Sequence, residues 1–139
     1  MKIAYLDTSA LLRILLDERD QLEEFTSWSA LYSSQLMRTE ALRTLHRLLM
    51  EGGLTETNFT EAYQRLLFFL QGIHLIALND KILLHAEKPL STILGTLDAI
   101  HLSSALLLRE ELNTETIAFL THDKQLARAC TIHGFQVYG

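Results

Sequence analysis

Four acidic residues lie at positions where a carboxylate could bind a metal ion or take part in catalysis, and not only be solvated. Each lies beside an apolar segment instead of inside a charged run; they are Asp7, Glu40, Asp98 and Asp123. Four ionised carboxylates brought together would repel one another and raise some of their pKa values. A hard divalent cation would relieve that repulsion, and oxygen ligands without cysteine favour Mg²⁺ or Mn²⁺. A divalent metal site is therefore the chemistry that these residues suggest.

Each acid also has a purely structural explanation. Asp7 and Asp123 follow apolar runs and could cap the helices that come next. Asp98 would lie in the first turn of a helix, where the positive end of the helix dipole favours an acid. Glu40 falls in the second turn of its helix, where no capping rule needs it and a solvated surface acid is the alternative. The four acids together are more informative than any one of them.

The elements that must position these acids alternate between strands and helices. Short apolar runs predict five strands, over residues 2–6, 31–35, 73–78, 117–121 and 135–138. Helical spacing of apolar residues, with glycine or proline at several ends, predicts helices over residues 8–16, 20–30, 36–53, 55–70, 80–87, 96–112 and 124–133. This alternation predicts an α/β fold, a parallel sheet with helices on both faces.

A parallel sheet of this kind would bring the acids together. Right-handed crossovers place the C-terminal ends of the strands, and the N-terminal ends of the helices that follow them, at one edge. Asp7 and Asp123 come where a strand passes into a helix, and Glu40 and Asp98 could reach the same edge from early helical turns. The sequence therefore predicts a shared acidic site at that edge.

Composition limits the class of protein. With 139 residues, 48% of them hydrophobic, and one proline, the chain is expected to form a single globular domain over residues 1–139. The only cysteine, Cys130, can form no internal disulfide and excludes the usual structural zinc patterns, so we expect a reduced, cytoplasmic setting. Because no apolar stretch approaches the roughly 20 residues of a membrane helix, we expect no membrane partner.

Net charge bears on the partner. At −5, the chain lacks the basic surplus of a generic nucleic-acid binder. If the four candidate acids are set aside as cation ligands, 13 of the 17 acids remain against 12 basic residues. The remaining surface is then nearly neutral, so nucleic acid stays open as a partner.

Four segments resemble the PIN-domain family, and most closely the bacterial VapC-type toxins. They are YLDTSALLRILL, SSQLMRTEALRTL, TLDAIHLSSALLL and FLTHDKQLARAC, and together they span nearly the whole chain in the family's order. The third segment, which contains Asp98, is the most specific. The resemblance implies a PIN-like fold, a three-layer sandwich of helices around a parallel sheet, and it places the acidic cluster on Asp7, Glu40, Asp98 and Asp123.

The resemblance also implies a Mg²⁺- or Mn²⁺-dependent endoribonuclease, the toxin of a type II toxin–antitoxin pair. In such an enzyme the acids would hold one or two metal ions, and a metal-activated water would cleave the RNA phosphodiester bond. Thr121, and the hydroxyls of Thr8 or Ser9, would support the acids or orient the substrate. The implied protein partners are a second copy of the chain, forming a homodimer, and a small antitoxin that covers the site.

Two other functions stay open at this stage. A receiver domain is also a small acidic α/β protein that binds Mg²⁺, and Asn79-Asp80 after the third strand could supply its phosphoacceptor. However, the first strand supplies a single acid, and Lys124 does not follow a clean terminal strand. The second alternative is a PIN-like module that only holds RNA or protein, and the complete acidic set argues against it.

Other residues near the acids have simpler interpretations. His101 lies one turn after Asp98 and could be mistaken for a metal ligand or a general base, but we expect a packed histidine. His122 is expected to be an exposed loop residue. Arg43 and Arg47 share one face of their helix, where contact with RNA phosphates or an antitoxin and a merely solvated face are equally open.

Overall fold

A computed structural model of the chain describes residues 2–16, 27–114 and 116–139. At its centre is a parallel sheet whose strands are β1 (Ile3–Leu6), β2 (Ala30–Ser34), β3 (Ile73–Ile76), β4 (Ile117–Leu120) and β5 (Gln136–Tyr138). The strands lie in the order β3-β2-β1-β4-β5, and every neighbouring pair is parallel. The five predicted strands and their parallel arrangement are confirmed.

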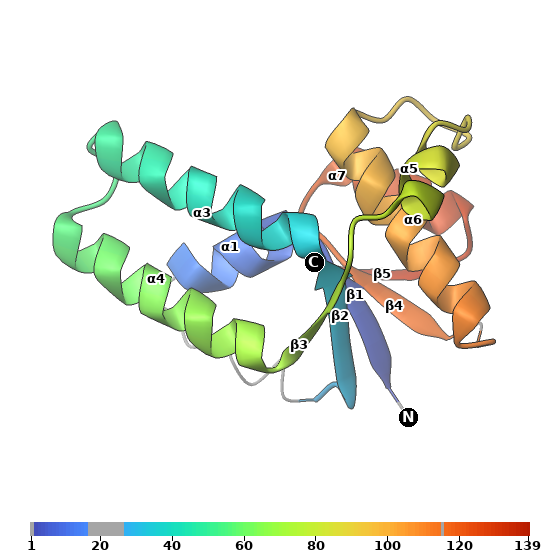
Figure 1. Cartoon of the computed structure of the whole chain (residues 1–139), viewed down its shortest axis with the longest axis horizontal. Helices are drawn as coiled ribbons and strands as arrows, with labels where there is room; N and C mark the ends of the chain where they lie inside the picture. Colours follow the sequence, from blue (N-terminus) through green and yellow to red (C-terminus); the bar gives the residue numbers. More distant parts are fainter. Residues whose placement is uncertain (1, 17–26, 115) are drawn as a thin grey trace.

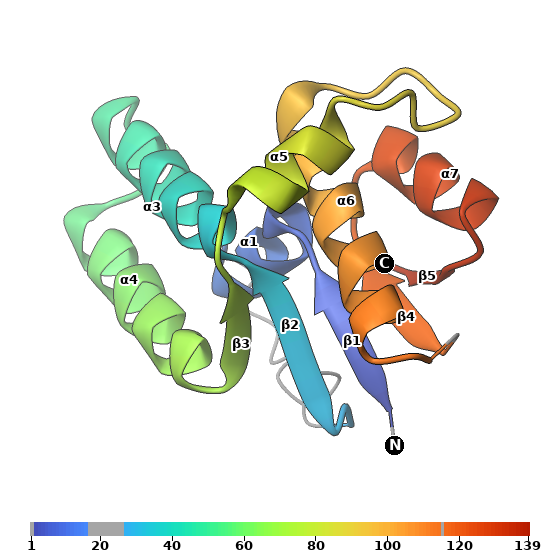
Figure 2. The same cartoon turned by 45° about the vertical axis from the view of Figure 1, so that its right-hand side comes forward.

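Helices cover both faces of this sheet. In the described ranges they are α1 (Thr8–Leu16), α3 (Gln35–Met50), α4 (Glu56–Gln71), α5 (Asp80–Ala86), α6 (Thr96–Glu111) and α7 (Lys124–Ile132). Figures 1 and 2 show α1, α3 and α4 on one side of the strands and α5, α6 and α7 on the other. The predicted three-layer α/β architecture is therefore confirmed.

Helix boundaries follow local signals in most places. Ser34 caps α3 by accepting a hydrogen bond from the backbone N–H of Leu36, and Gly52 ends the same helix with a φ of +79°.

Most of the helix predicted over 20–30 lies outside the residues that the structure describes. Its last part is wrong, because residues 27–29 are not helical and Ala30 begins β2.

The central strand shows why the sheet is covered on both faces. All four residues of β1 are buried, and they alternate in direction. Ala4 and Leu6 pack against α1, α3 and α4, while Ile3 and Tyr5 pack against α6 and α7. A short strand that is apolar throughout is what a parallel sheet between two helical layers requires.

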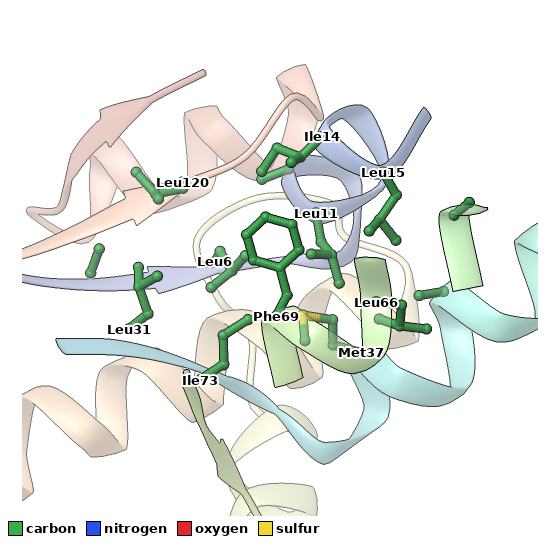
Figure 3. Packing of buried hydrophobic residues seen from close by; sticks show 14 of the residues in the cluster. Leu6, Leu11, Ile14, Leu15, Leu31, Met37, Leu66, Phe69, Ile73 and Leu120 are labelled. Atoms are coloured by element: carbon green, nitrogen blue, oxygen red, sulfur yellow. The ribbon is translucent and has the colours of Figure 1, made fainter. Parts of the chain in front are cut away.

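The core on the α1 side holds the first helix and α3 in place relative to the strand ends. Leu6 and Leu11 meet Met37 of α3 and Phe69 of α4 in this cluster (Figure 3). Phe69 of α4 is buried in this core, whereas its neighbour Phe68 is 67% exposed. This packing holds the starts of α1 and α3, where Asp7 and Glu40 lie. No helix in the described ranges is both long and apolar enough to cross a membrane.

Candidate active site

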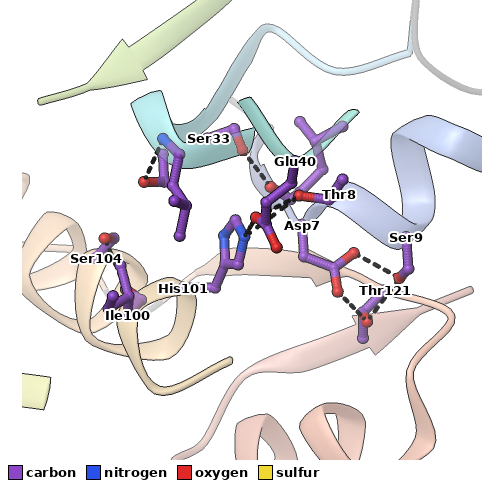
Figure 4. A network of polar contacts seen from close by, with 12 residues as sticks. Asp7, Thr8, Ser9, Ser33, Glu40, Ile100, His101, Ser104 and Thr121 are labelled. Atoms are coloured by element: carbon purple, nitrogen blue, oxygen red, sulfur yellow. Dashed lines mark hydrogen bonds and ion pairs between the residues drawn. The ribbon is translucent and has the colours of Figure 1, made fainter. Parts of the chain in front are cut away.

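Asp7 lies directly after β1, and its side chain is 3% exposed. Its backbone N–H donates to the carbonyl of Leu120, which fixes the residue at the end of the β1–β4 ladder. Oδ1 accepts hydrogen bonds from Ser9 Oγ (2.7 Å) and from the backbone N–H of Ala10 (3.1 Å), and Oδ2 accepts one from Thr121 Oγ1 (2.7 Å; Figure 4). Asp7 therefore caps α1, as its structural explanation predicts, and also belongs to a buried polar cluster.

Two hydroxyls connect Asp7 to the loop after β4. Ser9 Oγ lies 3.3 Å from Thr121 Oγ1 and accepts the backbone N–H of His122 at 2.9 Å. Thr121 Oγ1 accepts the backbone N–H of Asp123 at 3.0 Å. The start of α1 and the start of α7 are thus joined through the side chains that hold Asp7.

Glu40 is not a solvated surface acid. It lies in the second turn of α3 with its side chain 21% exposed, and its Oε1 accepts hydrogen bonds from Thr8 Oγ1 (2.7 Å) and His101 Nε2 (2.8 Å). Burial by itself would raise the pKa of Glu40, but the hydrogen bonds from His101 and Thr8 and the charge of His101 outweigh it, and the pKa is lowered. Glu40 is therefore ionised at neutral pH, and Thr8 supports Glu40 instead of Asp7.

His101 is buried, as the sequence predicts, with 2% of its surface exposed. What the sequence analysis missed is its contacts: Nε2 reaches Glu40, and Nδ1 lies 2.8 Å from the hydroxyl of Tyr5. Two signals indicate that His101 and Tyr5 lie near the site, although not that they bond each other. His101 follows Asp98 by three residues on a helix, and Tyr5 precedes Asp7 by two residues on a strand, so each pair shares a face.

Asp98 and Asp123 complete the acidic set. Asp98 lies in the first turn of α6, whose cap residue Gly95 supplies no side-chain hydrogen bond, and no donor in the described ranges bonds the Asp98 carboxylate. Burial, and then the negative charges of Asp123 and Asp7, raise the pKa of Asp98 to about 6. Asp123 caps α7, since its Oδ1 accepts the backbone N–H of Leu126 at 3.0 Å. Asp7 and Asp123 follow the C-terminal ends of the neighbouring strands β1 and β4, and the charges of both act on Asp98.

The chemistry of these donors fits a hard divalent cation. Burial raises the pKa of Asp7 against the hydrogen bonds of Thr121 and Ser9, and burial followed by the charges of Asp123 and Asp7 raises that of Asp98, so a nearby cation would favour the ionised form of both acids. Carboxylate oxygens are the ligands that Mg²⁺ and Mn²⁺ prefer. However, no three carboxylate, imidazole or thiol groups within 2–16, 27–114 and 116–139 are already arranged as a metal-binding group. The donor set is suitable, but it is not preformed as a cage.

The residues around the acids differ in how far they are exposed to solvent. His122 is exposed, and its Nδ1 lies 3.0 Å from Arg13 Nη1. Arg43 and Arg47 are exposed on α3. Cys130 is fully buried as a small core residue.

The segment that would serve a receiver domain has a structural role. Asn79 caps α5 by accepting the backbone N–H of Ile82 at 3.0 Å, and Asp80 lies in the first turn of that helix. Both residues are exposed, and they follow β3, a strand at the outer edge of the sheet. Capping by Asn79, and the helix dipole that favours an acid at Asp80, account for both residues without a phosphoacceptor.

Comparison with known proteins gives consistent matches. The sequence model of the PIN domain matches residues 4–132. The chain is 32% identical to Ribonuclease VapC47 of Mycobacterium tuberculosis (strain CDC 1551 / Oshkosh), over 94% of this chain and 92% of that protein.

Solved structures share the fold at low sequence identity. PAE2754 from Pyrobaculum aerophilum is 17% identical with a TM-score of 0.66, covering 98% of this chain and 83% of its own. VapBC-1 from nontypeable Haemophilus influenzae is 17% identical with a TM-score of 0.64, covering 98% of this chain and 96% of the matched one.

Proposed function

The chain belongs to the PIN-domain family, and from this premise we propose that it is a Mg²⁺- or Mn²⁺-dependent endoribonuclease, the toxin of a type II toxin–antitoxin pair. The observation that carries the proposal is the acidic cluster at the C-terminal end of the sheet. There Asp7 and Glu40 are each held by short hydrogen bonds, and burial with the charges of Asp123 and Asp7 raises the pKa of Asp98 to about 6. Similarity to a protein named as a ribonuclease supports the choice of RNA as substrate.

Four residues would hold the cation: Asp7, Glu40, Asp98 and Asp123. A bound divalent cation would stabilise the charge that develops on the phosphate oxygens and lower the pKa of an attacking water. Asp7 is oriented for this by Thr121 and Ser9, which hold one carboxylate oxygen each. Asp123 is held at the start of α7 by its capping bond. Asp7, Glu40 and Asp123 lose little conformational freedom on binding a ligand, because hydrogen bonds already orient their carboxylates.

Protein partners form part of the same proposal. A nuclease toxin requires an inhibitor in the cell that makes it, and we infer a small antitoxin that covers the acidic site. We also propose a homodimer. Large apolar side chains stand exposed on α5 and around the start of α6, a surface suited to protein contact; they are Leu83, Leu84, Ile93 and Leu97.

Cleavage of RNA by the purified protein tests the function. End-labelled RNA of several folds is incubated with the protein and Mn²⁺ or Mg²⁺, with EDTA and the Asp7→Asn variant as controls. We expect cleavage that both controls abolish. Cleavage that survives both controls contradicts the metal mechanism, and thermal stabilisation by the cation without cleavage of any RNA favours a binding module.

A further inference from the structure

Two buried residues of the site have no part in the metal set or in the support of Asp7. They are Tyr5 on β1 and His101 on α6, with exposed fractions of 0% and 2%. We propose that Tyr5 and His101 are a positioning pair that fixes the carboxylate of Glu40 and leaves only its second oxygen to a cation or to substrate. This inference rests on the proposed nuclease function and deepens it.

Donor and acceptor chemistry sets the direction of the hydrogen bonds. An ionised carboxylate can only accept, so His101 Nε2, 2.8 Å from Glu40 Oε1, carries the hydrogen of that bond. Nδ1 lies 2.8 Å from the Tyr5 hydroxyl, which donates to it when the ring is neutral. Burial raises the pKa of Tyr5, which keeps this hydroxyl protonated. The imidazole is thus held at both nitrogens, by Glu40 at one and by Tyr5 at the other.

Glu40 is held through one oxygen. Thr8 Oγ1 donates to Oε1 at 2.7 Å, beside His101, and the same hydroxyl lies 3.5 Å from His101 Nε2 (Figure 4). Within the part of the chain that the structure describes, no donor bonds Oε2. Two donors on one oxygen fix the rotation of the carboxylate, in the way that outer partners orient metal ligands in metalloproteins.

The partners come from three layers of the fold. Glu40 is on α3, which packs on one face of the sheet, His101 is on α6 on the opposite face, and Tyr5 is on the central strand. His101 and Asp98 are three residues apart, so they share a face of α6. The hydrogen bond from His101 therefore ties Glu40 to α6, the helix that carries Asp98.

The test compares three variants of the whole chain in RNA cleavage with Mn²⁺. His101→Leu removes both bonds of the ring, His101→Gln keeps an N–H near Nε2, and Tyr5→Phe removes only the hydroxyl. We expect kcat to fall about 30- to 100-fold, about 3-fold and about 10-fold respectively, with KM changed less than about 3-fold. Ser103→Ala is the matched control. Ser103 is also buried on α6, but it bonds His85 at 2.9 Å outside the site, so this variant should keep its kcat.

Two readouts do not depend on cleavage. Nitrogen NMR of the metal-free protein should show the His101 ring with a proton on Nε2. The Mn²⁺ dissociation constant, measured by water-proton relaxation, should increase about 10-fold or more in His101→Leu and stay unchanged in Ser103→Ala.

The outcomes separate the two proposals. Unchanged kcat and Mn²⁺ affinity in a folded His101→Leu protein, or a wild-type ring without a proton on Nε2, would overturn the positioning pair and leave the nuclease function standing. A wild-type protein that has the expected ring and Mn²⁺ affinities but cleaves no RNA removes the nuclease function instead. If His101→Leu does not fold, the kcat values of His101→Gln and Tyr5→Phe decide instead. Losses of about 3-fold and about 10-fold support the positioning pair, and an unchanged kcat in both variants overturns it.

Discussion

Replacing Asp98 with asparagine should stabilise the metal-free protein while it removes a cation ligand. Burial, Asp123 and Asp7 raise the pKa of Asp98 from an ordinary 3.8 to about 6, so the folded chain binds this proton more tightly than the unfolded chain does. The stability that this proton contributes is fully present below about pH 4 and is lost as the pH rises through about 6. Asparagine keeps the shape of the protonated acid and has no charge to repel.

The size of the effect follows from the shift in pKa. A shift of about two units corresponds to about 3 kcal/mol, and because Asp98 is only partly buried, solvent screening reduces this to about 1.5 kcal/mol. Loss of the favourable interaction between an acid and the dipole of α6 removes about 0.5 kcal/mol, which leaves about 1 kcal/mol. For a chain of 139 residues this is a rise in Tm of about 3 °C.

The assay is thermal unfolding in EDTA across the acidic and neutral range. The difference in Tm between Asp98→Asn and wild type should grow from near zero at about pH 4 to about 3 °C at about pH 7. Glu61→Gln, a change at an exposed acid of α4, is the control and should show no such difference. A variant that is less stable than wild type at neutral pH, or a gain that does not change with pH, would refute the reasoning.

Three further predictions follow from the same geometry. The Mn²⁺ affinity of the wild type should rise about tenfold between about pH 5 and pH 7 as Asp98 loses its proton, and an affinity independent of pH would count against Asp98 as a ligand. The double variant Arg43→Ala/Arg47→Ala should reduce the slope of log RNA affinity against log salt by about 1.4, whereas Lys88→Ala should not; equal slopes would mean a merely solvated face. Leu102→Ala, at a fully buried position of α6, should cost about 3 kcal/mol in urea unfolding, and a loss below about 1 kcal/mol would show that this core is loosely packed.

The architecture of this protein is readable from its sequence because parallel strands between helical layers must be short and apolar. The run over 117–121, for example, contains β4 (Ile117–Leu120), and the polar residues after it begin the connection to α7. The change from a short apolar run to a helical pattern also predicts that Asp7 and Asp123 lie at strand ends. Both acids do serve as caps, and capping does not exclude either of them as a cation ligand.

The contacts inside the site were not readable, because they join residues far apart in the chain. Thr8 and Glu40 are separated by 32 positions, and Tyr5 and His101 by 96. No spacing rule indicates that Thr8 would support Glu40 while Ser9 supports Asp7, since both hydroxyls stand next to the same aspartate in sequence. Only the packing of α3 and α6 against the sheet decides which hydroxyl meets which acid.

The most direct test of the account is the single-turnover rate at which the protein cleaves labelled RNA in Mn²⁺, measured for wild type and for Asp98→Asn. The variant is expected to be at least as stable as the wild type, so a loss of activity cannot come from unfolding. The account predicts that wild type cleaves, that EDTA stops it, and that the variant is slower by about a thousandfold or more. Equal rates for the two proteins, or cleavage that persists in EDTA, would contradict it.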